Sequence, residues 1–76
     1  MNNEQITHEL LLKFKGAKIG AKIPLSEQIK DIVGNPKFDV TETIQHIYNS
    51  GYFIFINSNI ATLNEDGFEY ANRNHY

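Results

Sequence analysis

Apolar side chains recur at helical spacing near the start of the chain. The residues concerned are Ile6, Leu10, Leu11 and Phe14. Spacings of four, five and eight residues place them on one side of a helix. Asn3 is a residue type that caps helix starts, and Gly16 is one that ends helices. We therefore predict a first helix over residues 3–15.

The chain then passes through an extended link into a second helix. Proline disfavours helical geometry in the residue before it, so Pro24 predicts an edge strand or extended link from Lys22 to Leu25. Ser26 can cap the helix that follows, and Gly34 can end it. The apolar side of this second helix consists of Ile29, Ile32 and Val33.

A third helix is predicted to end at Gly51, and its start has two candidates. Asn35 followed by Pro36 is one favourable start, and Asp39 is an equally good cap. The buried stripe of this helix consists of Val40, Ile44 and Ile47. The side away from the stripe carries Thr41, Glu42, Gln45, His46 and Asn49.

The last third of the chain has the pattern of a β-hairpin followed by a short helix. Residues 52–56 are strand-forming, residues 57–59 are turn-forming, and residues 60–63 return as a partner strand. Asn64 is placed to cap the short helix. The inner side of that helix holds Phe68 and Ala71.

Both sides of the predicted hairpin are apolar. Side chains alternate between the two faces of a sheet, so one set faces the core and the other faces outward. The inward set is Phe53, Phe55, Ala61 and Leu63. The outward set is Tyr52, Ile54, Ile56 and Ile60. An exposed patch of four large apolar side chains on so small a sheet predicts an interface with another protein or a second copy. The alternative is that the first helix or the C-terminal tail covers this face.

Length and composition set limits on the class of protein. We predict a single domain over residues 1–76, because the chain is too short for two. The chain has no cysteine, and no apolar run reaches the ~20 residues that cross a bilayer. We expect a cytoplasmic protein without a cofactor, a membrane segment or a small-molecule substrate.

The order of the elements favours an α+β fold. Helix, short strand, helix, helix, hairpin and short helix can bury every apolar side as three helices closed by a small antiparallel sheet. That layout is a winged helix. Its second and third helices form a helix-turn-helix, its hairpin forms the wing, and a short helix closes it.

Two stretches of the chain also resemble winged helix-turn-helix proteins. IPLSEQIKDIVGNPKFDVTETIQHIYNSGYF is similar to the core of such proteins, and ATLNEDGFEYANRN resembles the end of their wing. Asn64 stands where these proteins commonly have threonine, and both residue types cap helices. Over nearly its whole length the chain looks most like the short YjcQ-type proteins of bacteria and prophages.

The resemblance implies a small transcriptional regulator, of prophage origin and dimeric, that binds duplex DNA through its third helix. The residues matching the contact side of that helix are Lys37, Thr41, Glu42, Gln45, His46 and Asn49. Four more lysines could contact phosphates. Lys13 and Lys15 are explained by the end of the first helix, which leaves Lys18 and Lys22 as the DNA-binding candidates.

An alternative hypothesis is a winged helix that acts as an adaptor or inhibitor of another protein. The net charge is −2, and the turn at residues 57–59 has no cation to enter a minor groove. The outward set of the hairpin would then be the docking surface. The position of the lysines separates the hypotheses, because DNA binding requires them to lie beside the third helix.

We expect no enzymatic activity. His8, His46 and His75 are far apart in the sequence and lack metal-ligand spacing, and there is no cysteine to serve as nucleophile or ligand. The acids near the start of the last helix are favoured there by the helix dipole and need no catalytic explanation.

Overall fold

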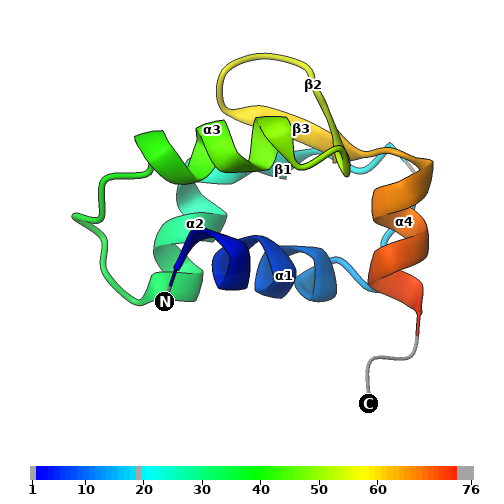
Figure 1. Ribbon diagram of the computed structural model, residues 1–76, viewed down its shortest axis with the longest axis horizontal. Helices are drawn as coiled ribbons and strands as arrows, with labels where there is room; N and C mark the ends of the chain where they lie inside the picture. Colours follow the sequence, from blue (N-terminus) through cyan, green and yellow to red (C-terminus); the bar gives the residue numbers. More distant parts are fainter. Residues whose placement is uncertain (1, 19, 74–76) are drawn as a thin grey trace.

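The chain folds into four helices and one three-stranded antiparallel sheet, an α+β structure (Figure 1). The computed structural model describes residues 2–18 and 20–73. The helices are α1 (Asn3–Lys13), α2 (Leu25–Val33), α3 (Thr41–Asn49) and α4 (Glu65–Asn72). Helix α1 contacts each of the other three helices, so it lies at the centre of the helical layer. The order of elements predicted from the sequence is confirmed.

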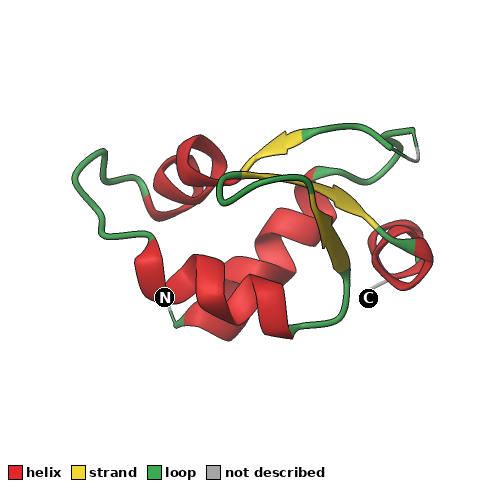
Figure 2. Cartoon of the chain, turned by 90° about the horizontal axis from the view of Figure 1, so that it is seen from above, coloured by secondary structure: helices red, strands yellow, loops and turns green. Residues whose placement is uncertain are grey.

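The sheet has the order β1-β3-β2, which places β1 and β2 at opposite edges (Figure 2). The strands are β1 (Ile23–Pro24), β2 (Phe53–Phe55) and β3 (Ile60–Leu63). Ala61 of β3 is the partner of Ile23 on one side and of Phe55 on the other. The predicted edge strand and hairpin are therefore confirmed, although β2 is shorter than residues 52–56.

The core forms where the sheet meets the helices. Its buried apolar residues are Ile6, Leu10, Leu11, Ile23, Leu25, Ile29, Ile47, Phe53, Ala61, Leu63 and Ala71. Three of the four inward hairpin residues belong to it, and the fourth, Phe55, is half-buried. Thr43 is a buried polar residue that the apolar pattern did not identify. Its hydroxyl donates a hydrogen bond to Asn3 Oδ1 at 2.7 Å, which offsets the cost of burying it.

The cap of α1 is Asn2, so the prediction of Asn3 is wrong by one residue. Asn2 Oδ1 accepts a hydrogen bond from the Gln5 backbone N–H at 2.8 Å. In return the Asn2 N–H donates to Gln5 Oε1 at 3.0 Å. This reciprocal pair is a capping box. It requires a glutamine or glutamate three residues after the cap; Asn2 has Gln5 at that position, whereas Asn3 has Ile6.

The start of α2 also differs from the prediction, because Ser26 does not cap it. The helix begins at Leu25, whose N–H donates to the backbone oxygen of Asn59 at 2.7 Å. The Ser26 N–H donates to the Asn59 side-chain oxygen at 2.8 Å. A residue of the hairpin turn, distant in sequence, therefore satisfies the first N–H groups of α2.

The other two helix starts agree better with the prediction. Helix α3 begins near the later of its two candidate starts, where Asp39 Oδ1 accepts from the Thr41 N–H at 3.0 Å. Asn64 caps α4 as predicted, because its Oδ1 accepts from the Gly67 N–H at 2.8 Å. Gly34 ends α2 with a left-handed φ of 79°, also as predicted.

Candidate functional site

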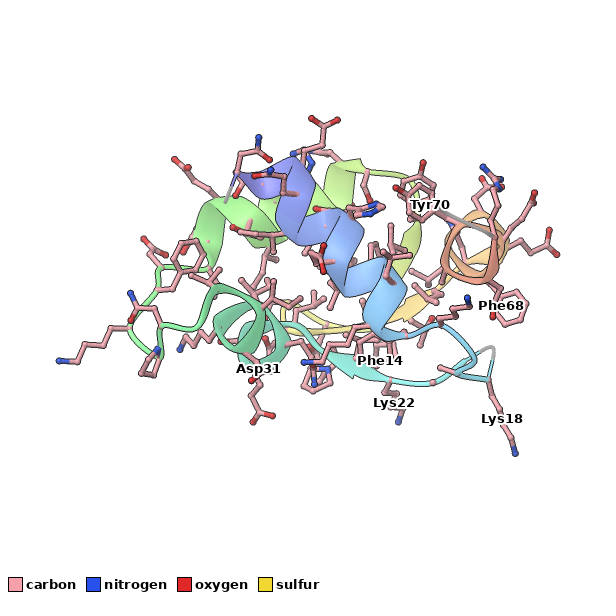
Figure 3. The ribbon with its side chains drawn as sticks, turned by 90° about the horizontal axis from the view of Figure 1, so that it is seen from below. Phe14, Lys18, Lys22, Asp31, Phe68 and Tyr70 are labelled. Atoms are coloured by element: carbon pink, nitrogen blue, oxygen red, sulfur yellow. The ribbon has the colours of Figure 1, made fainter. Side chains whose placement is uncertain are left out.

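Lys18 and Lys22, the two lysines predicted to contact phosphates, do not lie beside α3. Lys18 and Lys22 are exposed next to β1, and α3 lies on the opposite side of the molecule (Figure 3). The topology agrees, since α3 packs against β2, which lies at the edge of the sheet opposite β1. Lys13 instead forms an ion pair with Asp31 of α2. These lysines therefore do not extend the surface of α3.

The remaining DNA-binding candidates do gather on and before α3. Thr41, Glu42, Gln45 and Asn49 are exposed on the helix, and His46 is half-buried. Lys37 is exposed in the turn that precedes the helix. This grouping follows the predicted helical period.

The charge around α3 is unfavourable for phosphate. Two acids, Asp39 and Glu42, lie at the start of α3 and are exposed, and Lys37 in the preceding turn is the cation nearest to them in the sequence. Binding to a nucleic-acid backbone depends on lysine and arginine, and α3 itself has neither.

Large apolar side chains are exposed on α3 and on the hairpin. Tyr48 is 63% exposed, Ile54 57% and Ile56 53%. The ring of Tyr48 meets the ring of Phe55 edge-on, with their centroids 5.2 Å apart, so α3 packs against the inward side of the hairpin. Ile54 and Ile56 point to the other face of the sheet, because side chains alternate along β2. The sequence prediction omitted Tyr48. Its spacing of three residues from Gln45 was the available signal that it lies on the exposed side of the helix.

A groove separates α3 from the hairpin. It is a hollow of about 270 Å³ lined by Ile44, Gln45, Tyr48, Phe55, Asn57 and Ser58, and we call it the α3–hairpin groove. Its lining has aliphatic and aromatic side chains from α3 and β2 and polar side chains from α3 and the hairpin turn, with no ionised residue. Such a lining favours an apolar side chain held among hydrogen-bonding groups.

The outward set of the hairpin is only partly as predicted. Ile54 and Ile56 are exposed, whereas Ile60 and Tyr52 are half-buried. Tyr52 precedes the first residue of β2, so strand alternation no longer fixes its direction. Its ring lies against Tyr70 of α4 with their centroids 5.1 Å apart. Tyr52 is therefore not part of the same patch as the isoleucines.

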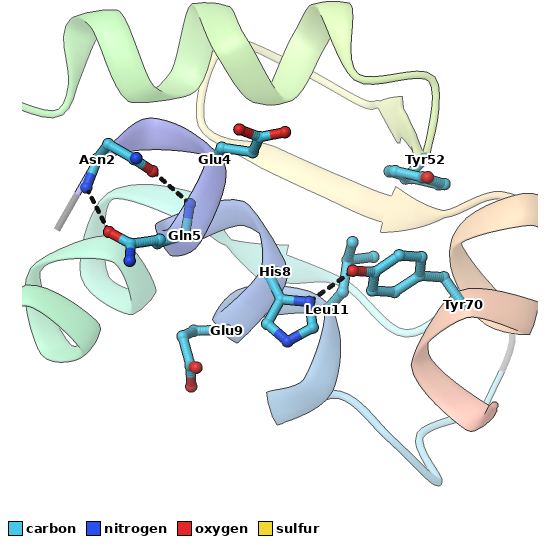
Figure 4. Close-up of a pocket in the computed structure, with 8 residues that line it drawn as sticks. All are labelled: Asn2, Glu4, Gln5, His8, Glu9, Leu11, Tyr52 and Tyr70. Carbon is cyan, nitrogen blue, oxygen red and sulfur yellow. Dashed lines mark hydrogen bonds between the residues drawn. The ribbon is translucent and has the colours of Figure 1, made fainter. Parts of the chain in front are cut away.

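A second hollow of about 500 Å³ lies between α1, α4 and the start of β2 (Figure 4). It is lined by Asn2, Glu4, Gln5, His8, Glu9, Leu11, Tyr52 and Tyr70. His8 Nδ1 and the Tyr70 hydroxyl are 2.5 Å apart and share a hydrogen bond. This bond joins α1 to α4, which gives His8 a structural role.

Histidines and acids do not assemble into a metal centre in the part of the chain that the structure describes. His8 is hydrogen-bonded to Tyr70, and His46 lies on a different helix, α3. His75 lies outside the described residues.

Comparisons with known proteins identify no relative. No protein-family model, curated protein or solved structure matches the chain. Within residues 2–18 and 20–73, no helix is both long and apolar enough to cross a membrane. The surfaces of α3 and the hairpin are therefore the basis on which a function can be proposed.

Proposed function

We propose that the chain is a winged helix that binds another protein through α3 and the β2–β3 hairpin. The observation that carries the proposal is the exposure of three large apolar side chains, Tyr48 on α3 and Ile54 and Ile56 on the hairpin, on elements that have no lysine or arginine. Exposed apolar patches of this kind mark protein interaction sites. This is the adaptor or inhibitor hypothesis from the sequence.

The arrangement of elements supports the winged-helix assignment. Helices α2 and α3 are joined by the loop of residues 34–40, and the β2–β3 hairpin follows α3 directly. Strand β1 closes the small sheet on the far side of β3. In such a layout α3 and the hairpin lie next to each other, and here they enclose the α3–hairpin groove.

The exposed apolar side chains can contribute more to binding than charged side chains at the rim of an interface. Fully burying one large apolar side chain is worth about 1.5–3 kcal/mol, so the exposed part of each of these residues is worth about half of that. Three such contacts at the centre of an interface contribute several-fold more than an exposed ion pair at its rim, worth about 0–1 kcal/mol.

Affinity capture tests the proposal. We expect the immobilised chain to retain a partner from extracts of the cells that produce it, and a variant with Ile54→Lys and Ile56→Lys to lose that partner. Both positions are exposed, so the variant should fold as the wild type does. The matched control, Glu9→Lys with Glu27→Lys, places two lysines on exposed sites of α1 and α2. A partner retained equally by the isoleucine variant would overturn the proposal.

DNA binding remains a second candidate function because of one observation on α3. Thr41, Gln45 and Asn49 are exposed and spaced four residues apart, so they form one polar ridge. Glutamine and asparagine suit adenine edges in the major groove. Lys18 and Lys22 lie away from this ridge and cannot add phosphate contacts to it, so we favour protein binding over DNA binding.

A further inference from the structure

The two edge strands of the sheet, β1 and β2, differ in how readily an added strand could pair with them. At the β1 edge Pro24 has no N–H to donate, and the neighbouring Lys22 is exposed. Proline and lysine are the residues that protect sheet edges in natural proteins. Strand β2 is the opposite edge of the described sheet, and its sequence Phe53-Ile54-Phe55 contains neither. The β2 edge is therefore the one suited to pairing.

The backbone groups at the β2 edge can be assigned from the hydrogen bonds of the hairpin. The Tyr52 carbonyl and the Ile56 N–H both bond toward the β3 side, at 3.1 Å and 2.8 Å. Antiparallel pairs alternate with a period of two, so Ile54 also faces β3. The N–H and C=O groups of Phe53 and Phe55 consequently face the outer edge. They form a short row of donors and acceptors for an added strand.

The α3–hairpin groove lies beside this edge. Ile44 and Tyr48 of α3 line one side of the groove, and Phe55 of β2 lines the other. A strand added to β2 would turn every second side chain toward the helices, as Phe53 and Phe55 do. The hollow is slightly smaller than pockets for drug-sized molecules, which span about 300–1,000 Å³, and suits one apolar side chain.

The charged residues next to the groove indicate which charge a partner segment would carry. Glu42 lies one helical turn before Gln45, a residue of the groove, and Asp39 precedes the same helix. Lys37, in the turn before the helix, offsets one of these two acids, so one net negative charge remains at the start of α3. Opposite charge across an interface favours association, and like charge opposes it. The complementary segment carries lysine or arginine.

We propose that an extended segment of the partner protein adds to β2 as a fourth strand of the sheet. One apolar side chain of the segment occupies the α3–hairpin groove, and basic residues flank that side chain. This is recognition by strand addition, in which backbone hydrogen bonds provide affinity and a side-chain pocket provides specificity. The inference rests on the proposed function and specifies the kind of partner.

Selection from a random peptide library displayed on phage tests the proposal with the whole chain as bait. Phe55→Pro serves as the parallel bait, because it removes an outward N–H and edge strands tolerate proline at such positions. We expect peptides with an apolar residue between basic residues to be enriched on the wild-type chain and not on Phe55→Pro. The bait Phe55→Leu also removes the ring that lines the groove but keeps the N–H, so enrichment on Phe55→Leu that exceeds enrichment on Phe55→Pro measures the part due to the N–H.

A second measurement uses the enriched peptide in synthetic form and does not depend on the fold of any variant. Hydrogen exchange followed by NMR should show the Phe53 and Phe55 amides slowed when the peptide is bound. A copy of the peptide methylated on the backbone nitrogens that face β2 keeps every side chain. It should bind about tenfold more weakly or worse, because it cannot donate those hydrogen bonds.

Each contrary result overturns a defined part of the proposal. Equal binding of the methylated peptide, with both amides unprotected, would overturn strand addition and leave the protein-binding surface standing. Enrichment of acidic peptides, or no enrichment on the wild-type bait, would overturn the stated partner chemistry. Amide protection that rises with the concentration of the chain alone would assign the edge to a second copy. Failure of the proposed function would appear separately, in the capture experiment.

Discussion

Asp39 lies just before α3, and the fold lowers the pKa of its carboxyl group. Its carboxylate is fully exposed and accepts a hydrogen bond from the Thr41 backbone N–H at 3.0 Å. That bond favours the ionised form and is the main cause that holds the pKa of Asp39 below its ordinary value of 3.8. The Thr41 hydroxyl contributes in the same direction.

This shift makes stability depend on pH in acid. The pKa of Asp39 is lower in the folded state, so the unfolded state takes up the proton first as the pH falls. The stabilisation is present above pH 3.8 and is lost as the pH falls through the folded-state pKa. Urea unfolding from about pH 5 to about pH 2.5 should give a steeper loss for the wild type than for Asp39→Ala. Identical slopes would show that the bond to Thr41 has no energetic effect.

Gly67 holds α4 against the start of β2. A Cβ atom at this position would lie 2.1 Å from the backbone oxygen of Tyr52. That oxygen also accepts the Asn64 N–H at 3.1 Å, so it cannot move away freely. Alanine normally stabilises a helix by about 1 kcal/mol relative to glycine, and here the clash opposes that gain.

We expect Gly67→Ala to lower the free energy of unfolding by roughly 1–3 kcal/mol, because the overlap with backbone outweighs the gain in helix propensity. Denaturant unfolding measures this directly. The control Glu69→Ala changes an exposed side chain of the same helix and should stay within about 0.5 kcal/mol of the wild type. A neutral or stabilising Gly67→Ala would show that α4 can shift without cost.

At the scale of elements, Asn59 couples the hairpin turn to α2. It satisfies the N–H groups of Leu25 and Ser26, which are 2.7 Å and 2.8 Å from its two oxygens. Asn59→Ala removes the side-chain acceptor, and we expect a loss of about 1 kcal/mol in the free energy of unfolding. Asn59→Asp keeps an acceptor and should restore most of the stability. Equal losses in both variants would mean that the side-chain bond is not what stabilises α2.

The prediction of element boundaries succeeded where the signal was local and failed where it was not. Asn64 caps a helix through a residue three positions away, so its role could be read from its neighbours. Ser26 has the right residue type for a cap, but the acceptor for α2 comes from a turn 33 residues further on. No local pattern contains that contact. Asn2 and Asn3 are equal in type, and only Gln5 distinguishes them.

In the candidate site, too, the features set by local periodicity could be predicted from the sequence, and those set by the tertiary fold could not. The exposed residues of α3 follow from helical periodicity, and Ile54 and Ile56 follow from strand alternation. The separation of Lys18 and Lys22 from α3 depends on which edge of the sheet carries β1, and this is a property of the tertiary fold. Tyr52 was misplaced because strand alternation does not hold beyond the end of β2.

At the scale of the whole molecule, charge divides along the chain. All six lysines lie between residues 13 and 37, and five of the nine acids lie between residues 39 and 69. A net charge of −2 therefore conceals two regions of opposite sign. The hairpin carries no charged residue, and α3 carries only Glu42, so neither element has a cation to contact phosphates.

We therefore expect no measurable binding of mixed-sequence duplex DNA at ~50 mM salt, where nonspecific phosphate contacts are strong. Fluorescence anisotropy with a labelled duplex at ~50 mM and ~200 mM salt measures this. Binding that weakens with salt would restore the DNA hypothesis. A log–log slope of about −3.6 would then indicate phosphate contacts by all four lysines from Lys13 to Lys22, and a slope near −1.8 would indicate two.

The cap of α2 also constrains the order in which the protein matures on the ribosome. The side chain that completes this helix is translated 33 residues after the N–H group it satisfies. A nascent chain that has emerged only through Ser50 contains α1, α2 and α3 but lacks both the cap and two strands of the sheet. We expect such a chain to stay open to chaperones and proteases until the hairpin emerges and the whole domain closes in one late step.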